Sequence, residues 1–304
     1  MAQYKVAVLM AVYNGINWLP AQIKSILNQH QVDISLFISD DFSSDGSYEY
    51  LQSLTLRGNR IQLLPQTTKF GAAGKNFYRL IQDVDITNYS YVAFADQDDV
   101  WEQDKLIRHI LLINEHKADG VSSNVMAFWA GGKEKLIVKS QPQRSLDFLF
   151  ESAGPGCTFL MTPWLVNKVR EQLIDGKSVA RIVNLHDWLT YAVCRAYGRR
   201  WIIDSKPTLK YRQHENNVVG ANSGLKAKWV RLMKLRQGWY RAEVTKVSAV
   251  CAAISGKPEI KNILYSLTNK NIISQLKLLS YVPQARRKIL DRLILFISIL
   301  CFLF

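Results

Sequence analysis

The chain has 304 residues, 48% of them hydrophobic, and its 39 basic and 25 acidic side chains give a formal net charge of +14. This mixture of apolar and charged residues excludes an intrinsically disordered chain. The charge is uneven, because residues 1–198 hold 19 basic and 20 acidic side chains whereas residues 199–304 hold 20 and 5. The C-terminal segment thus carries +15, which indicates a partner of negative charge, either an anionic membrane face or a nucleic acid.

Cysteine usage and the two chain ends give further expectations. The four cysteines form no CxxC pair, which favours a reducing compartment and argues against a structural zinc site. The first six residues lead into a strand-like run without the pattern of a cleavable signal. The apolar run Leu293–Phe304 would be about 18 Å long as a helix, which is too short to cross a bilayer.

Apolar runs and helical patterns alternate over the first 130 residues. The runs that predict strands are Val6–Val12, Ile34–Ser39, Arg60–Leu64 and Tyr91–Ala95. The patterns that predict helices lie at residues 18–27, Tyr48–Leu56, Gly74–Ile81 and Gln103–His116. We expect an α/β domain with a mostly parallel sheet flanked by helices.

The pattern is looser after Gly120. A further helix is expected at Asp187–Tyr197, and residues 225–250 have the pattern of a helix rich in Lys and Arg. No linker rich in Pro, Gly or Ser separates this basic part from the rest. We expect an α/β domain over residues 1–224 and a basic, amphipathic helical region with an apolar end over residues 225–304.

The motif Asp96-Gln97-Asp98-Asp99 places three carboxylates directly after a predicted strand. Ligands of parallel sheets bind beyond the carboxyl ends of the strands. Three mutually repelling carboxylates are suited to a hard divalent cation, which prefers oxygen ligands and also accepts diphosphate oxygens. The alternative is a solvated acidic turn that caps the next helix.

Three other polar motifs have both a functional and a structural interpretation. Asp41, in a polar stretch after another strand, has the chemistry to accept an N–H from a pyrimidine base, or it belongs to a capped turn. Asp187, at a helix start, is a candidate general base or an N-cap. His214 and Arg212 have the chemistry to bind a metal and phosphate oxygens, or they are surface residues of a loop.

These motifs occur together in an order that resembles the family 2 glycosyltransferases, inverting enzymes with the Rossmann-like GT-A fold. The resemblance covers residues 4–220 and rests on residues 8–15, residues 39–47, the run Phe94–Trp101, His186-Asp187-Trp188 and Arg212-Gln213-His214. Residues 96–101 together with residues 211–220 look most like bacterial polysaccharide rhamnosyltransferases. The Gln-x-x-Arg-Trp motif of processive synthases is absent from the sequence, so we expect a non-processive enzyme.

The resemblance implies a role for each motif. It assigns Asp187 as the catalytic base that deprotonates the acceptor hydroxyl. It assigns Mg²⁺ or Mn²⁺ to Asp98 and His214. The residues that it assigns to the donor are Tyr13, Asn14, Asp41, Asp96 and Arg212, and those near the donor sugar and acceptor are Gly156, Cys157 and Trp188. His186 departs from the family pattern, since many relatives have Glu there.

The function that the resemblance implies is transfer of a sugar, with L-rhamnose from dTDP-rhamnose as the first choice, to a lipid-diphosphate-linked oligosaccharide. Such a transferase of O-antigen or another bacterial surface polysaccharide would be cytoplasmic and peripheral on the inner face of the cell membrane. The C-terminal region would bind the anionic membrane surface. It could instead pack on the α/β domain or in a homodimer.

Other hypotheses stay open at this point. A glucosyl- or galactosyltransferase would carry the same motifs. A nucleic-acid-binding protein would use the +15 segment with Trp229, Trp239 and Tyr240 as stacking residues, although we expect no nucleic-acid partner. A non-catalytic scaffold of the same fold is a third alternative, and the intact Asp41, Asp98, Asp187 and His214 argue against it.

Overall fold

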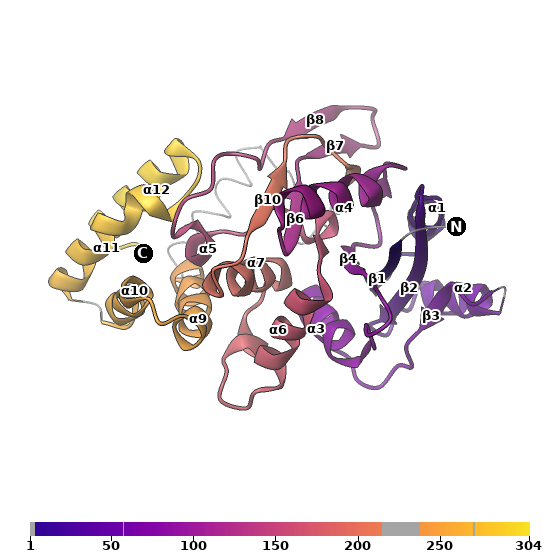
Figure 1. The fold of residues 1–304 in the computed structure, drawn as a ribbon, viewed down its shortest axis with the longest axis horizontal. Helices are drawn as coiled ribbons and strands as arrows, with labels where there is room; N and C mark the ends of the chain where they lie inside the picture. The colour runs from indigo at the N-terminus through magenta and orange to yellow at the C-terminus, as the bar shows by residue number, and fades with distance from the viewer. Residues whose placement is uncertain (1–3, 57, 215–237, 270) are drawn as a thin grey trace.

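Strands joined by helices make up most of the protein, whose computed structural model describes residues 4–56, 58–214, 238–269 and 271–304 (Figure 1). A large sheet contains β1 (Tyr4–Val12), β2 (Val32–Asp40), β3 (Ile61–Leu63), β4 (Tyr91–Ala95), β6 (Gly120–Ser123), β9 (Leu160–Met161) and β10 (Trp201–Asp204). A small sheet contains β5 (Val100–Trp101), β7 (Val125–Trp129), β8 (Glu134–Ile137) and β11 (Leu209–Gln213). All four strands predicted from the apolar runs are confirmed, with ends that differ by up to two residues.

Up to residue 83 strands and helices alternate, and beyond it the order is less regular. The helices up to residue 196 are α1 (Leu19–Leu27), α2 (Ser47–Thr55), α3 (Ala73–Asp83), α4 (Lys105–His116), α5 (Asp147–Phe150), α6 (Pro163–Ile174) and α7 (His186–Ala196). The described residues after 237 form four more helices, α9 (Trp239–Ile254), α10 (Pro258–Thr268), α11 (Ile272–Ala285) and α12 (Ile289–Leu300). Single 3-10 turns lie at Gly156–Thr158 and Ala180–Ile182.

The large sheet has the strand order β10-β6-β9-β4-β1-β2-β3, and all of its pairings are parallel except those of β9 with β4 and β6. The small sheet has the order β5-β11-β7-β8. The predicted α/β class with a mostly parallel sheet is therefore confirmed. The small sheet was not predicted, because its strands are short and follow no clear alternation of apolar residues.

Helices cover both faces of the large sheet, and β1 shows why. From Val6 to Val12 every residue of this strand is buried, as is typical of a central parallel strand. Since side chains alternate along a strand, Ala7 and Leu9 join one core cluster with α3, α6 and α7, whereas Val8 and Met10 join another with α1 and α4. The buried residues Leu106, Ile110 and Ile113 of α4 lie in this second cluster.

The carboxyl ends of β1, β2 and β4 meet at one edge of the large sheet. Register pairs Val12 with Asp40 across β1 and β2, and Met10 with Ala95 across β1 and β4. The loops that follow these three strands therefore begin side by side, and they carry the acidic motifs.

The C-terminal helices belong to the same core as the sheet. Residues of all four helices, such as Val247, Ile263, Leu278 and Leu295, lie in one buried cluster with residues of β1, α3 and α7. The predicted division near residue 225 falls in residues 215–237, outside the described part of the chain. Within the described residues, no helix is long and apolar enough to span a membrane.

The shared core predicts that a cavity in α10 destabilises the whole protein. Ile263 is fully buried, so Ile263→Ala is expected to lower the free energy of unfolding by about 2–5 kcal/mol. Because the cluster is continuous, the loss should appear as one cooperative transition at lower temperature, measured by circular dichroism and by Trp fluorescence.

Ile272→Ala is the matched control, since this isoleucine is 67% exposed and its truncation should change stability by about 0.5 kcal/mol or less. Two separate transitions in Ile263→Ala would contradict a shared core.

Candidate functional site

The backbone just after β1 and a side chain of α1 hold the loop that follows β4. The backbone N–H of Tyr13 donates to Gln97 Oε1 at 2.9 Å, and the Gln97 amide donates back to the Tyr13 carbonyl at 2.9 Å. A Cβ at Gly15 would lie 2.4 Å from the same Gln97 oxygen, so only glycine leaves room for this amide. The Gln22 amide donates to the Asp96 carbonyl at 2.6 Å. The acidic motif is thus held at both its first and its second residue.

The small sheet brings His214 to Asp98. Antiparallel pairing of β5 with β11 sets Val100 opposite Lys210, so the end of β11 runs past the acidic loop. His214 Nε2 lies 2.6 Å from Asp98 Oδ2, across a sequence separation of 116 residues. The Arg212 guanidinium donates to the Asp98 carbonyl at 2.8 Å. Trp18 stacks on the His214 ring with the centroids 4.1 Å apart.

Asp98 and His214, the two residues expected to bind a metal, are therefore in contact. A carboxylate and an imidazole beside further carboxylates form a donor set that divalent cations accept. The Asp98 side chain is only 11% exposed, so it lies at the floor of the site rather than in an open surface turn.

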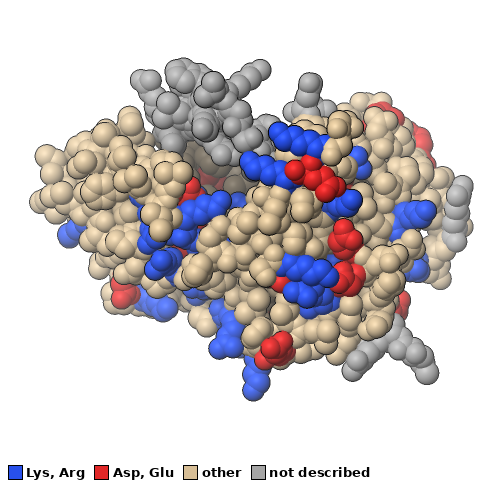
Figure 2. Space-filling model, turned by 90° about the horizontal axis from the view of Figure 1, so that it is seen from above, with Lys and Arg blue, Asp and Glu red and all other residues tan. Residues whose placement is uncertain are grey.

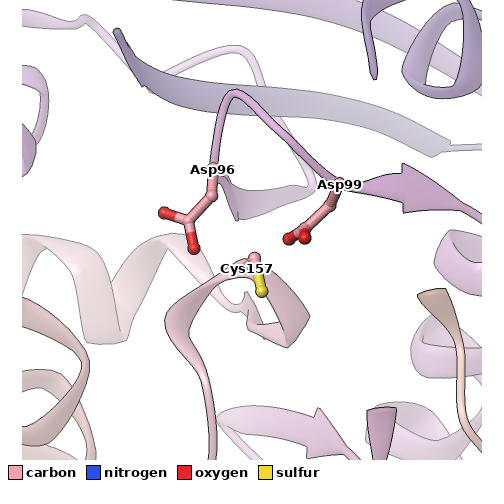
Figure 3. Close-up of side chains that lie close together, drawn as sticks. All are labelled: Asp96, Asp99 and Cys157. Carbon is pink, nitrogen blue, oxygen red and sulfur yellow. The ribbon is translucent and has the colours of Figure 1, made fainter. Parts of the chain in front are cut away.

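Asp96, Asp99 and Cys157 form a second group, whose oxygen and sulfur atoms all lie within 4.8 Å of one another (Figure 3). Burial, together with the negative charges of Asp98 and Asp187, raises the pKa of Asp96 to about 7. Burial also raises the pKa of Asp99 and that of the Cys157 thiol well above their usual values. This group is a candidate metal site of mixed oxygen and sulfur ligands.

Lys105, at the start of α4, is a residue that the sequence interpretation missed. Its ammonium nitrogen lies 3.5 Å from the centre of the Trp101 ring, and the side chain is fully buried. Burial lowers the pKa of Lys105 to about 7, although the charges of Cys157 and Asp99 act in the opposite direction. From the sequence, a lysine at a helix start is expected to be exposed. Only the structure shows that Lys105 is buried beside the acidic group.

The loop after β2 is held by the carboxylate of Asp41. The backbone N–H groups of Phe70 and Gly71 donate to its two oxygens at 2.5 and 2.8 Å. Asn14, with a left-handed backbone, accepts from the Ser44 N–H at 2.8 Å. The predicted donor residues Tyr13, Asn14 and Asp41 thus lie in two adjoining loops, and Tyr13 is 47% exposed.

Asp187 lies in the first turn of α7, where it was expected, and its carboxylate accepts from the Trp188 N–H at 2.7 Å. Burial raises the pKa of Asp187 to about 6, although hydrogen bonds from Trp188 and Ser152 and the charge of Lys139 lower it. The charge of Asp187 in turn raises the pKa of Asp96, so the two carboxylates share one site. No sequence motif marks Ser152 or Lys139 as a residue of the site.

Gly156 allows the loop before β9 to lie against the start of α7. A Cβ at this position would lie 2.5 Å from His186 Nε2 and 3.2 Å from the Asp187 Cβ. His186 cannot move away easily, because its ring stacks on Phe77 at 3.8 Å and meets the edge of Phe94. Burial lowers the pKa of His186 to about 3, so the ring is neutral.

Trp188, a predicted site residue, packs into the protein core. It is 3% exposed, its indole N–H donates to the Phe148 carbonyl at 2.9 Å, and it stacks on Tyr240 of α9. Its side chain therefore packs between α7 and the C-terminal region. Tyr240 is likewise engaged in this contact rather than presented for stacking with a nucleobase.

Comparison with known proteins agrees with this arrangement. The sequence model "Glycosyl transferase family 2" matches residues 7–159, which include the loops after β1, β2 and β4 and the Gly156 turn. The chain belongs to glycosyl transferase family 2. It is similar to the dTDP-rhamnosyl transferase RfbG of Shigella flexneri, with 45% identity over 85% of this chain and 92% of the relative.

A more distant relative and a solved structure extend the comparison. A UDP-Glc:alpha-D-GlcNAc-diphosphoundecaprenol beta-1,3-glucosyltransferase, WfgD of Escherichia coli, is 32% identical over 55% of this chain and 64% of that protein. The crystal structure of S. aureus TarS residues 1–349 with UDP-GlcNAc has a TM-score of 0.56 at 14% identity, covering 91% of this chain and 79% of that one. The GT-A fold expected for a family 2 glycosyltransferase is thus confirmed.

The Gly156 contact predicts a variant that folds but transfers poorly. In Gly156→Ala the added methyl group must displace His186 and the first turn of α7, which carries Asp187. A displacement of about 1 Å at a reacting group can lower a rate about a hundredfold. We expect a loss of that size in kcat, measured with the nucleotide-sugar donor at saturation.

Gly176→Ala is the control, since nothing lies within 4 Å of its added Cβ. Wild-type kcat in Gly156→Ala would show that the turn tolerates the shift.

Proposed function

We propose that this glycosyltransferase transfers L-rhamnose from dTDP-rhamnose to a lipid-diphosphate-linked oligosaccharide of a bacterial surface polysaccharide, one sugar per acceptor and with inversion. The choice of donor rests on the 45% identity to a dTDP-rhamnosyl transferase over most of both chains. The choice of acceptor is supported by the diphosphoundecaprenol in the name of the second relative. A glucosyl or galactosyl donor is the alternative, since that relative is named for UDP-Glc.

The residues around the strand ends would hold the donor in an extended pose. Tyr13 and Asn14 would line the nucleotide, and the buried Asp41 would accept an N–H from the base once the loop carrying Phe70 gives way. Asp96 would contact the ribose. Gly156 and Cys157 would lie near the donor sugar, and Trp188 would support the acceptor side from behind.

Mg²⁺ or Mn²⁺, when bound, offsets the negative charge that builds on the leaving nucleoside diphosphate. Asp98 and His214 would hold the cation, because their 2.6 Å contact brings an oxygen and a nitrogen ligand to one point. Arg212, anchored on the Asp98 carbonyl, would add a positive charge beside the diphosphate oxygens.

Asp187 is the proposed general base, and its environment suits that role. Burial raises its pKa to about 6, so the carboxylate is ionised near neutral pH yet more basic than an exposed aspartate. Asp187 would take the proton of the acceptor hydroxyl while that oxygen attacks the anomeric carbon. The diphosphate leaves from the opposite face, so the anomeric configuration inverts in a single displacement.

A donor screen tests the proposal directly. dTDP-rhamnose should support transfer to a synthetic lipid-diphosphate oligosaccharide with Mg²⁺ or Mn²⁺, and UDP- and GDP-sugars should not, as measured by mass spectrometry of the product. In Asp187→Asn, transfer should fall at least about a thousandfold while donor affinity stays within about twofold, because only the base is lost. The wild-type rate should rise with pH through about 6, as Asp187 loses its proton.

EDTA should abolish wild-type transfer. Asp204→Asn serves as a control for the loss of a buried carboxylate, since Asp204 of β10 pairs with Arg108 of α4 and not with the acidic motif. Turnover retained in Asp187→Asn would exclude this residue as the base. Efficient transfer from UDP-glucose and none from dTDP-rhamnose would show that the proposed donor is wrong.

We also propose that the C-terminal region binds the anionic inner face of the cell membrane. In α12 only Leu295, Ser298 and Ile299 are buried. The apolar residues that stay more than 40% exposed on α11 and α12 are Ile272, Ile273, Leu276, Ile289, Leu290, Leu293, Ile294, Phe296, Ile297 and Leu300. Figure 2 shows this end of the molecule, on the left, as a largely uncharged surface with basic side chains along its lower edge.

Such a surface suits partial insertion rather than a soluble face, because a monomer rarely exposes so large an apolar patch. Exposed Lys277 and Lys288 lie on or next to the same helices and would contact lipid phosphates. The predicted basic residues 226–236 lie outside the described residues. A homodimer through α12 is the competing use of this surface.

Vesicle co-sedimentation distinguishes these two uses. The double variant Leu293→Ser/Ile297→Ser should pellet less than wild type with vesicles containing anionic phospholipid, since it removes two large apolar groups that are about half exposed. Both proteins should pellet weakly with neutral vesicles.

Leu111→Ser/Ile174→Ser is the matched control, because both residues are equally exposed but lie on α4 and α6. Equal pelleting of the two double variants would exclude the membrane surface, and a concentration-dependent dimer lost only in the first variant would favour a protein interface. Truncation near residue 224 is unsuitable, since it removes part of the core.

A further inference from the structure

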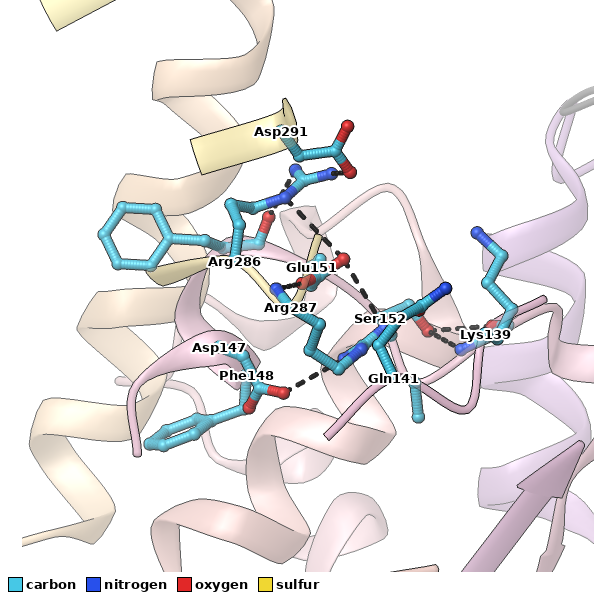
Figure 4. Close-up of polar contacts among 12 residues, drawn as sticks. Lys139, Gln141, Asp147, Phe148, Glu151, Ser152, Arg286, Arg287 and Asp291 are labelled. Atoms are coloured by element: carbon cyan, nitrogen blue, oxygen red, sulfur yellow. Dashed lines mark hydrogen bonds and ion pairs between the residues drawn. The ribbon is translucent and has the colours of Figure 1, made fainter. Parts of the chain in front are cut away.

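Arg287, between α11 and α12, connects the C-terminal region to the segment that precedes Gly156. Its guanidinium is 1% exposed and donates to Asp147 Oδ2 at 3.1 Å and to the Ser152 carbonyl at 2.6 Å. Its backbone N–H donates to Glu151 Oε1 at 2.6 Å (Figure 4). One residue of the C-terminal region thus holds both ends of the segment 147–152.

Two of these partners lead directly to Asp187. The Ser152 hydroxyl donates to the Gly154 carbonyl at 2.9 Å. Rotation of this hydroxyl directs its single hydrogen to the Asp187 carboxylate instead, where the hydrogen bond lowers the pKa of Asp187. Asp147, fully buried, accepts from the Tyr191 hydroxyl at 2.9 Å, one turn beyond Asp187 in α7. Arg287 is therefore connected to Asp187 through Ser152 on one side, and through Asp147 and Tyr191 of α7 on the other.

The C-terminal region also fixes the chain just before α7. Glu243 of α9, fully buried, accepts from the backbone N–H of Asn184 at 2.9 Å and from its side-chain amide at 2.6 Å. Asn184 cannot shift toward α3, because its carbonyl oxygen is in contact with Gly74. Two segments near Asp187 are therefore anchored by the C-terminal region. Residue 184 is held by α9, and segment 147–152 is held by the α11–α12 junction.

We propose that Arg287 is a positioning residue for Asp187, acting through Ser152 and Asp147. The inference rests on the proposed role of Asp187 as the base. The planar guanidinium group donates hydrogen bonds to a carboxylate and a carbonyl at the same time, whereas a lysine ammonium is a single charge on a flexible chain. Without Arg287, Asp147 and Glu151 lose a buried countercharge, and the segment that carries Ser152 moves away from α7.

Kinetics and pH profiles of Arg287→Lys and Arg287→Met test this role. With both substrates at saturation, kcat should fall about tenfold in Arg287→Lys and about a hundredfold in Arg287→Met, while the donor KM changes less than about twofold. The acidic limb of the kcat profile should move to higher pH in Arg287→Met, because loss of the Ser152 hydrogen bond raises the pKa of Asp187. Ser152→Ala should move it in the same direction, and this variant serves if Arg287→Met does not fold.

Arg170→Met is the matched control for a general loss of stability. Arg170 also donates to two backbone carbonyls, those of Ile81 and Val84, both at 2.6 Å, but at the far end of α3. Its substitution should lower the melting temperature and leave the pH limb in place.

An unchanged kcat and pH limb in both Arg287→Met and Ser152→Ala, with Asp187→Asn inactive, would overturn the inference and leave the proposed function intact. An active Asp187→Asn would instead remove the base on which the inference rests.

Discussion

The burial of several carboxylates at one edge of the large sheet is the constraint on which the rest of the site depends. Asp96, Asp98, Asp99 and Asp187 act on one another strongly enough that burial and repulsion raise the pKa of Asp96 to about 7. Folding gains nothing from such a cluster, since each buried charge needs a countercharge or a proton. The surrounding structure supplies His214 and Arg212 on one side and the buried Lys105 on the other.

This constraint explains the small sheet. Its strands are short, and the pairing of β5 with β11 carries Arg212 and His214 to Asp98. A binding site for a diphosphate with its cation would complete the neutralisation. A divalent cation at these carboxylates would weaken their mutual repulsion, so the same electrostatics that raises the pKa of Asp96 would favour cation binding.

Sequence reasoning succeeded where the signal is local. The strands β1, β2 and β4 are continuous apolar runs, so the fold class and the positions of Asp41 and Asp98 in the loops after β2 and β4 could be predicted. The position of Asp187 at the start of α7 could be predicted too, and the roles of these three residues stay predictions. It failed where the signal is long-range. The burial of Lys105 and Trp188 and the contribution of Ser152 depend on which segments come together, and no periodicity of the chain encodes that.

The basic residues of the C-terminal region have more than one structural role, which their net charge does not show. A net charge of +15 suggests one basic surface, but Arg241 and Arg287 are buried and bonded within the protein. They join the C-terminal helices to one another and to segment 147–152, rather than facing a partner.

Helix α12 has two different faces. Leu295 and Ile299 pack into the shared core, and the other apolar residues of the helix stay exposed. If a membrane covers that exposed side, the α11–α12 junction and segment 147–152 connect the lipid-covered helix to the surroundings of Asp187. A lipid-linked acceptor held at that surface would then meet the base from the side that Arg287 supports.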